Sequence, residues 1–270
     1  MIYKYYSPSK NNFDAVHNQY FWFSKHKTLN DPFDMAGDLF RRFPDFLFSN
    51  SVYHHRYTNA IRSYGTCCFS KNPLNKHLWA LYASSYSGFV LGFDDSSFVD
   101  DLSLSLDGRV IYRECHYEEE YPDFNNPNTL IPFYDCDGDF SELVLRDIIN
   151  ENPMDPKKID QIFEYYLLIK EKKTWAIEEE KRLILGQTFV NALQEHRVSP
   201  DICINLSDYS NGYKIKWPEG SLREVYLGNR MQESDKASLL SGLSGQTVIK
   251  KVIETQATGR NFALTASEYE

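Results

Sequence analysis

Hydrophobic positions along this chain fall mostly in short runs rich in Tyr, Phe, Val, Ile or Leu, separated by polar turns. Such runs predict β-strands, because β-branched and aromatic side chains pack well on a pleated surface. The predicted strands cover residues 1–6, 21–24, 64–70, 88–93, 110–112, 202–206, 213–217 and 222–228. Strands interspersed with a few helices indicate an α+β fold.

Apolar residues at helical spacing form a smaller number of segments. They predict helices at residues 74–85, 159–174 and 234–243, two short helices within residues 34–62, and a last helix or strand at residues 246–253. In the first helix, Leu78, Trp79, Leu81 and Tyr82 form the apolar side. In the second, Lys170 falls on the same spacing as the apolar residues.

The motif Leu29-Asn-Asp-Pro-Phe-Asp34 predicts a turn, because Asn, Asp and Pro favour local bonds between side chain and backbone. We expect Phe33 to anchor this turn in the core. Asn30 and Asp31 are expected to order the loop, either as turn-capping residues or beside a functional site.

The 270 residues are enough for one large domain with a substantial core. We interpret residues 1–270 as a single α+β domain. Residues 113–157 are acidic and rich in Asn, Asp and Pro, which predicts an irregular, loop-rich insertion.

Charge and cysteine content narrow the functional classes. The net charge of −9, from 29 basic and 38 acidic residues, argues against nonspecific coating of nucleic acid. Five cysteines without a C-x-x-C pair support neither a disulfide framework nor a zinc site. The first residues lack an apolar leader, and no run of apolar residues is long enough to span a membrane. We therefore expect a cytoplasmic protein with reduced thiols.

The stretch Trp-Ala-Ile-Glu-Glu-Glu-Lys-Arg at residues 175–182 contains the strongest candidate chemistry. On a strand, Glu178, Glu180 and Arg182 share one face, with the two carboxylates roughly 7 Å apart. Arg182 would then hold one carboxylate in a bidentate ion pair and leave the other free for a substrate. Such a pair can bind a sugar hydroxyl and stabilise a developing cation.

The same residues also allow a helix. Glu and Lys are good helix formers, and Glu178 and Arg182 form an i,i+4 pair typical of an exposed helix surface. In that interpretation one helix would run from about Pro156 to Leu185, and the glutamates would be solvated.

Several motifs, in this order, resemble those of a widespread bacterial family of domains of unknown function. The matching pieces are Tyr3-Lys4-Tyr5, Phe23-Ser24, Leu29 to Asp34, Cys68-Phe-Ser70, Leu78-Trp79, Tyr82, Gly88-Phe89, Gly92-Phe93, Trp175-x-x-Glu178-x-Glu180-x-Arg182 and Val225-Tyr-Leu-Gly228. They span residues 3 to about 230, and residues 113–157 match nothing in the family.

That family looks like a distant relative of the ADP-ribosyltransferase fold. The resemblance implies a split, mixed or antiparallel β-sheet with flanking helices and three strands that carry the site. The first strand has Lys4 where the better-known groups have His or Arg, the second ends at Ser70, and the third carries Glu178 and Glu180. In the relatives the Glu-x-Glu lies on a strand after a helix, which favours the strand interpretation here.

The resemblance further implies an NAD-dependent transferase. The glycosidic bond to nicotinamide breaks through an oxocarbenium-like state. Glu180 would bind the ribose 2′-hydroxyl and stabilise that charge, and Glu178 would position or deprotonate the acceptor. NAD is the only cofactor implied, and no metal site.

Other residues are assigned to NAD binding on the same resemblance. Lys4 and Tyr5 would contact the adenosine ribose or the phosphates, and Ser70 the nicotinamide ribose. Trp79 or Tyr82 would stack on nicotinamide, although both also suit a plain aromatic core. Arg182 would orient a carboxylate or contact a phosphate, unless it forms a structural ion pair with Glu178.

Similar bacterial enzymes include toxins of antiphage defence and toxin–antitoxin systems. The resemblance thus implies a macromolecular acceptor, with nucleic acid such as RNA slightly favoured over protein, and a neutralising antitoxin as partner. No membrane partner is implied.

Two other functions remain open. A metal-dependent nuclease toxin would use Asp31 or Asp34 with Glu178 and Glu180 as oxygen ligands for Mg²⁺. A nucleotide-binding module without turnover would need no catalytic carboxylate.

Overall fold

The computed structural model describes residues 1–31, 33–34, 64–96, 98, 110–123, 126–134, 140–147, 156–186, 190–191, 195, 198, 200–204, 209–243, 251–257 and 264–268. The two helices predicted within residues 34–62 lie outside this set, apart from Asp34. Within the described residues no helix is long and apolar enough to cross a membrane.

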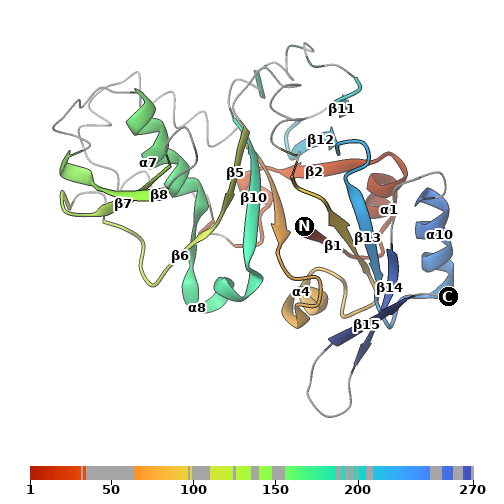
Figure 1. The fold of residues 1–270 in the computed structure, drawn as a ribbon. Helices are drawn as coiled ribbons and strands as arrows, with labels where there is room; N and C mark the ends of the chain where they lie inside the picture. Colours follow the sequence, from red (N-terminus) through yellow and green to blue (C-terminus); the bar gives the residue numbers. More distant parts are fainter. Residues whose placement is uncertain are drawn as a thin grey trace.

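A large, curled and mainly antiparallel sheet organises the described residues (Figure 1). Its strands are β1 (Ile2–Tyr6), β2 (Tyr20–Ser24), β3 (Gly65–Ser70), β4 (Phe89–Phe93), β5 (Val110–Glu114), β10 (Glu180–Leu185), β11 (Cys203–Ile204), β12 (Gly212–Lys216), β13 (Leu222–Leu227), β14 (Lys251–Ala257) and β15 (Leu264–Glu268). The order is β11-β12-β2-β3-β1-β4-β13-β14-β15, and β10 joins β3 to β5. One pair, β13 with β14, is parallel. The predicted α+β class is confirmed.

The sheet divides at β3. One edge of β3 pairs with β10 over its whole length, from Gly65 to Ser70. On the other edge β1 pairs at Ser70 and β2 pairs at Thr66. Cys68 lies between these two points, so β1 and β2 leave a fork in the sheet at this residue.

Helices cover the sheet on both faces (Figure 1). They are α1 (Lys10–His17), α4 (Lys76–Leu81), α7 (Pro156–Leu168), α8 (Lys172–Trp175) and α10 (Glu233–Leu243), with the 3₁₀ turns η1 (His26–Thr28) and η3 (Ala176–Glu178). The side chain of Ser9 caps α1 by accepting from the Asn12 N–H, which satisfies a free donor at the helix start. Helices α1 and α10 pack against each other.

Alternation along β3 and β10 creates two different faces. Cys67, Phe69, Leu183 and Leu185 belong to the main hydrophobic core. Ile184 points the other way, into a second core built mainly by α7. Because successive strand residues face opposite sides, Thr66, Cys68 and Ser70 of β3 and Glu180 and Arg182 of β10 share the face of Ile184.

The helix predicted at residues 159–174 is shorter than expected. Helix α7 ends at Leu168, and Ile169–Glu171 forms β9, which pairs in parallel with β6 (His116–Glu118). Lys170 therefore lies on a strand. The single helix from Pro156 to Leu185 is also wrong, because β9 and β10 interrupt it.

Part of the predicted insertion at residues 113–157 is regular. It holds the end of β5, β6, and the hairpin strands β7 (Leu130–Tyr134) and β8 (Phe140–Val144). The strand β15 near the chain end was not predicted either, because that segment is polar. Pairing with neighbouring strands overrides weak local propensity here.

Two predicted core positions are exposed. Phe33 is 67% exposed and Leu81 is 66% exposed, so neither anchors its segment in the core. In the turn, Asp31 and Asp34 are buried instead. The described cysteines Cys67, Cys68, Cys115 and Cys203 are free thiols.

Candidate functional site

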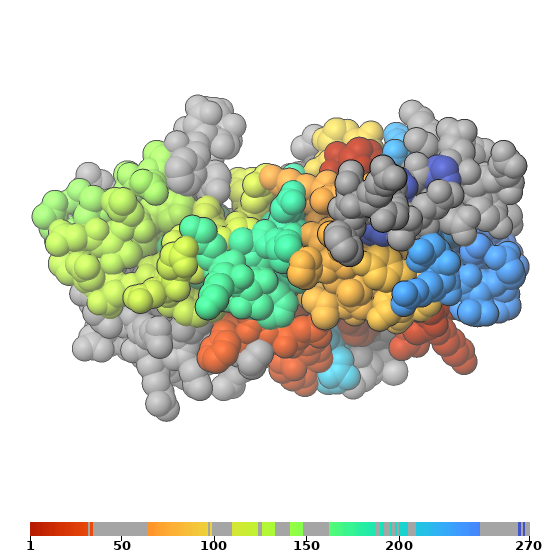
Figure 2. All heavy atoms as spheres, turned by 90° about the horizontal axis from the view of Figure 1, so that it is seen from below, coloured from red at the N-terminus to blue at the C-terminus, as the bar shows by residue number. Residues whose placement is uncertain are grey.

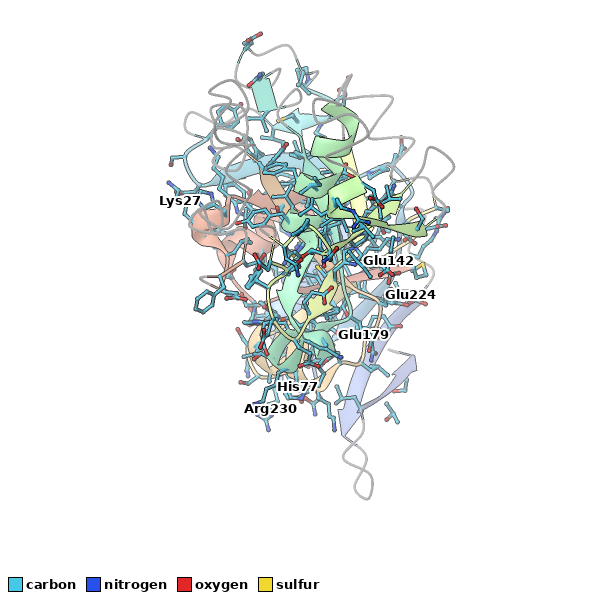
Figure 3. The ribbon with its side chains drawn as sticks, turned by 90° about the vertical axis from the view of Figure 1, so that its left-hand side faces the viewer. Lys27, His77, Glu142, Glu179, Glu224 and Arg230 are labelled. Carbon is cyan, nitrogen blue, oxygen red and sulfur yellow. The ribbon has the colours of Figure 1, made fainter. Side chains whose placement is uncertain are left out.

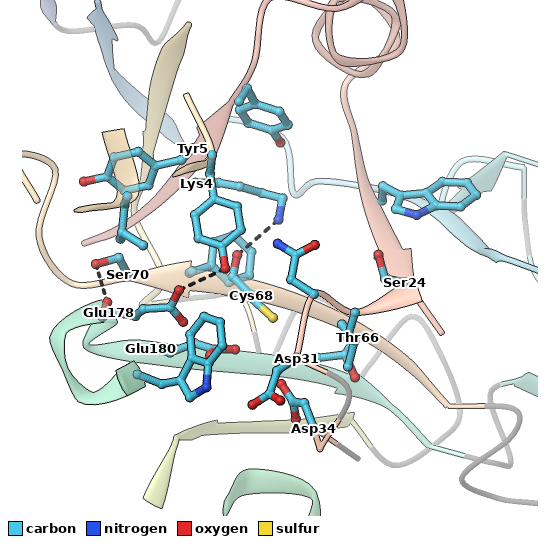
Figure 4. Close-up of a pocket in the computed structure, with 18 of the residues that line it drawn as sticks. Lys4, Tyr5, Ser24, Asp31, Asp34, Thr66, Cys68, Ser70, Glu178 and Glu180 are labelled. Carbon is cyan, nitrogen blue, oxygen red and sulfur yellow. Dashed lines mark hydrogen bonds between the residues drawn. The ribbon is translucent and has the colours of Figure 1, made fainter. Parts of the chain in front are cut away.

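A cavity of about 280 Å³ lies at the fork of the sheet (Figure 4). Its lining comes from β1, α1, β2, the segment at residues 28–34, β3, α4 and the residue after it, β9, α8, η3 and β10. In Figure 2 the α8–η3–β10 segment (blue-green) lies beside the α4 segment (orange) on one face of the molecule. The volume is near the lower end of the range of about 300–1,000 Å³ for small-molecule sites.

The register of β3 and β10 places the polar residues of the site. Glu180 lies opposite Ser70, and Arg182 lies opposite Cys68. Directly paired residues of an antiparallel ladder point to the same face, so these four side chains gather on one side of the sheet. This face meets the cavity at Ser70, Cys68 and Glu180.

Glu178 is not on the strand, which corrects the predicted Glu-x-Glu strand. It ends η3, and Glu179 then adopts a left-handed conformation with φ of 47° before β10 begins. The exposed side chain of Glu179 is labelled in Figure 3. This turn brings Glu178 back over the start of β10 while Glu179 points away.

Lys170 joins the two glutamates. Its Nζ donates to Glu178 Oε2 and to Glu180 Oε2, both at 2.7 Å. The ring of Trp175 lies 4.6 Å from Nζ, within the range of a cation–π contact. Lys170 is only 5% exposed and lines the cavity. Lys170 was not identified as a site residue from the sequence. Its one distinguishing feature is that it directly follows the apolar run at residues 167–169, and it was counted there as part of the predicted helix.

Arg182 is fully buried and does not line the cavity. Its Nε donates to Glu180 Oε1 at 2.7 Å, and both terminal nitrogens donate to the Asp34 carboxylate. Nη1 also donates to the Leu167 carbonyl at 2.8 Å. The predicted ion pair with Glu178 is wrong. Arg182 instead ties the turn at residues 29–34 to β10.

Neither glutamate is free, in contrast to the expectation from the strand pattern. With all groups ionised, the cluster has three carboxylates, Asp34, Glu178 and Glu180, against the two cations Lys170 and Arg182. One negative charge is therefore in excess beside the cavity. Buried charges need such partners, because desolvation of an unpaired ion is very costly.

The environments of the two glutamates shift their pKa values apart. Burial raises the pKa of Glu178, against the opposing effect of Lys170. Burial would also raise the pKa of Glu180, but Arg182 and Lys170 outweigh it and lower that pKa. Opposed shifts in a carboxylate pair are typical of an acid–base residue beside a permanently charged one.

Tyr82 and Ser70 position Glu178, and Figure 4 labels Ser70 and Glu178. The Tyr82 hydroxyl donates to Glu178 Oε1 at 2.9 Å. The Ser70 hydroxyl donates to the backbone carbonyl of Glu178 at 2.8 Å, which ties η3 to β3. Both residues also line the cavity.

Trp79 does not reach the cavity in the described structure. It is fully buried, its ring stacks on Tyr86 with centroids 6.1 Å apart, and its Nε1 donates to the Pro73 carbonyl. These contacts support the alternative interpretation of Trp79 as an aromatic residue of the core. Trp22 and Trp175 line the cavity instead. Trp175 belongs to the motif at residues 175–182, whereas the sequence pattern gave no signal for Trp22.

Lys4 and Tyr5 enter the cavity from β1. In the fork, the Lys4 Nζ donates to the Cys68 carbonyl at 3.1 Å (Figure 4). The Tyr5 hydroxyl donates to the Asn72 carbonyl and accepts from the Asn75 N–H, which holds the segment before α4.

Asn30 and Asp31 border the cavity, as predicted for residues that order the loop. Asp31 Oδ1 accepts from the Phe33 N–H at 2.9 Å, a local bond that caps the turn. Asp31 is thus a turn-capping residue that also lines the cavity.

The carboxylates proposed as Mg²⁺ ligands are engaged by cations of the protein. Lys170 and Arg182 bond Glu178, Glu180 and Asp34. Among the described residues, no three His, Cys, Asp or Glu side chains form a group that could hold a metal ion.

The chain was compared with protein-family models, curated proteins and solved structures, and none of them matches it.

Proposed function

We propose that this protein is an NAD-dependent ADP-ribosyltransferase that acts at the fork of the sheet. The observation that carries the proposal is the pair Glu178 and Glu180, which share Lys170, have opposed pKa shifts and both line the cavity. One glutamate stays charged and the other exchanges a proton, which is the division of labour that glycosyl transfer needs.

Glu180 supplies the fixed negative charge. Its carboxylate is held by Arg182 and Lys170, so it does not reorganise when charge develops on the ribose. A preorganised charge in a water-poor site stabilises a transition state more effectively than a mobile one. The excess negative charge of the cluster favours an oxocarbenium-like state.

Glu178 takes the role of general base toward the acceptor. Burial raises its pKa toward neutrality, which improves proton acceptance near physiological pH. The hydroxyl of Tyr82 orients the Oε1 atom that does not contact Lys170.

The cavity lining has groups that suit both halves of NAD. The two glutamates and Lys4 line it together. We assign nicotinamide and its ribose to the glutamates, with Trp175 and Tyr82 as aromatic walls, and the phosphates to Lys4.

The biological setting belongs to the same proposal. The enzyme acts as a cytoplasmic toxin of a defence or toxin–antitoxin system, modifies a macromolecule, and is neutralised by an antitoxin. Nucleic acid, RNA in particular, is the favoured acceptor. These assignments depend on the motif resemblance and on no contact in the structure.

The test is transfer from labelled NAD in a cell lysate, resolved into protein, RNA and DNA fractions. Wild type and Glu179→Gln, whose exposed side chain lies outside the cluster, should label one fraction equally. Glu180→Gln should lose about 10²–10³-fold of the rate, the usual effect of removing one preorganised electrostatic group. Glu178→Gln should reduce transfer more than nicotinamide release.

Folded wild type that neither transfers label nor releases nicotinamide would exclude this function. Nucleic-acid cleavage that requires divalent metal and no NAD would establish the nuclease instead. Nucleotide binding with a biological effect unchanged in Glu180→Gln would establish a binding module.

A further inference from the structure

Lys170 is the cavity-lining cation that touches both glutamates. We propose that Lys170 is a positioning residue, which holds Glu178 and Glu180 in one arrangement and keeps Glu178 available as a base. This inference rests on the proposed function for its kinetic consequence, but its electrostatic consequence can be measured without turnover.

The contacts of the Lys170 ammonium group are directed at the two glutamates and Trp175. An ammonium group has three N–H donors. Two are used at 2.7 Å by Glu178 and Glu180, and the Trp175 ring faces the nitrogen at 4.6 Å. The strand β9 sets the position of Nζ, so the spacing of the carboxylates follows from the backbone of β9, η3 and β10.

The electrostatic effect is unequal for the two carboxylates. Arg182 contacts Glu180 and not Glu178. Without the charge of Lys170, the carboxylates of Glu178 and Glu180 would face each other, and only Glu180 would still contact a cation, Arg182. Like charges at such a distance raise the pKa of the weaker partner, so Glu178 would take up the proton.

No other described cation could replace Lys170 beside Glu178. Apart from Arg182, which contacts Glu180, the titratable groups that face the pair from the surrounding elements are acids: Asp31, Asp34, Cys68, Tyr82, Cys115 and Tyr117. Lys4 lines the same cavity but bonds the Cys68 carbonyl.

The first experiment is a carbon-13 NMR titration of the Glu178 side-chain carboxyl, assigned by the signal lost in Glu178→Gln. In Lys170→Met the midpoint should rise by about one pH unit or more, equivalent to a tenfold gain in proton affinity. Lys170→Arg keeps the charge and should restore the midpoint at least in part. Lys173→Met on α8, which removes an exposed lysine, should leave it unchanged.

The second readout is the pH profile of label transfer from NAD to the lysate fraction that wild type labels. If Glu178 must be ionised, the acid limb of the transfer rate should move to higher pH in Lys170→Met by the same amount as the titration midpoint. A merely structural lysine would lower activity equally at every pH. A folded Lys170→Met protein with an unchanged midpoint and an unchanged limb would overturn the proposal.

Lys170→Met could fail to fold, because it leaves a buried charge unpaired. Lys170→Met combined with Glu178→Gln removes one charge of each sign and should recover folding, measured by circular dichroism and urea unfolding. No recovery in the double variant would count against the charge argument. A midpoint shift without turnover in wild type would reject the proposed enzyme function and retain the electrostatic role of Lys170.

Discussion

At the scale of residues, the site depends on charges that are buried and mutually paired. Arg182 illustrates this, because a fully buried guanidinium contacts two carboxylates and a backbone carbonyl. Breaking a buried pair leaves its partners uncompensated, whereas an exposed pair contributes little.

We therefore expect Arg182→Met to lower the free energy of unfolding by about 3–5 kcal/mol, the usual result when one partner of a buried ion pair is removed. Arg223→Met is the matched control, because Arg223 is partly exposed and lies 3.6 Å from Asp94. Its loss should stay below about 1 kcal/mol. Urea unfolding measures both, and similar losses in the two variants would contradict the interpretation of Arg182.

Tyr6, in contrast to Arg182, has a buried polar group without a partner in the described structure. Its ring stacks on Phe89 in the core, and its hydroxyl is buried without a hydrogen-bond partner in the described structure. An unsatisfied buried polar group costs about 1–3 kcal/mol. Tyr6→Phe should therefore unfold at an equal or higher urea concentration than wild type.

Tyr20→Phe is the control for that change. The Tyr20 hydroxyl donates to Asp14 at 2.7 Å, so its removal should lower the free energy of unfolding by about 1 kcal/mol. If Tyr6→Phe destabilises the protein as much as Tyr20→Phe does, its hydroxyl has a partner.

At the scale of elements, the connection from β9 through α8 and η3 to β10 builds the glutamate pair. Two short helical turns and one left-handed residue, Glu179, replace the continuous strand that the pattern suggested. The Glu171 side chain caps α8 by accepting from the N–H groups of Lys173 and Thr174. These local features decide where Glu178 lies relative to Glu180.

Glu179→Gly tests the importance of the left-handed residue. A side chain in this conformation costs about 1–2 kcal/mol, and glycine avoids the cost. The variant should be more stable by up to about 1 kcal/mol, after the entropy that glycine loses on folding. Thermal unfolding measures the change.

Glu179→Ala removes the same carboxylate but keeps the Cβ atom, so it should show no such gain. Both variants should keep the activity of wild type, since the Glu179 side chain is exposed and outside the cluster. Equal stability of the glycine and alanine variants would argue against a left-handed turn.

At the scale of the whole molecule, carboxylates that link distant strands make stability depend on pH. Asp95 follows β4 and accepts hydrogen bonds from Tyr112 of β5 and Lys181 of β10. Burial would raise its pKa, but these bonds outweigh burial and lower it. A lowered pKa contributes stability above the unfolded value of about 3.9 and loses it as the pH falls.

Asp95→Asn removes this contribution. The difference in free energy of unfolding between pH 7 and pH 3 should therefore be smaller in the variant than in wild type, as measured by urea unfolding. Asp147→Asn, at an exposed position, is the control and should retain the wild-type difference. Equal pH dependence in Asp95→Asn and wild type would show that Asp95 does not link these strands.

Most strands of the described sheet could be predicted from the sequence. Runs such as Phe89–Phe93 and Leu222–Leu227 are apolar, β-prone and bounded by turn residues. Such runs can be recognised as strands without knowing which strands pair with them. The same reasoning failed at Leu264–Glu268, whose polar residues form a strand only because β14 pairs with it.

The chemical identity of the site was also visible in the sequence. Glu178, Glu180 and Arg182 were recognisable as candidates because alternation along a strand would place two carboxylates and a guanidinium on one face. Their partners were not recognisable. Asp34 is 148 positions from Arg182, and no periodicity connects them.

The sequence alone thus determined the α+β class, most strands and the residue types of the site, because these depend on local propensity and alternation. Only the tertiary structure decided that Lys170 lies between the two glutamates, that Asp34 pairs with Arg182, and that Phe33 and Leu81 are exposed. These facts depend on where α7 stops, on the left-handed turn at Glu179 and on the fork at β3. Each of these is set by contacts between segments far apart in the chain, and local patterns carry no information about such contacts.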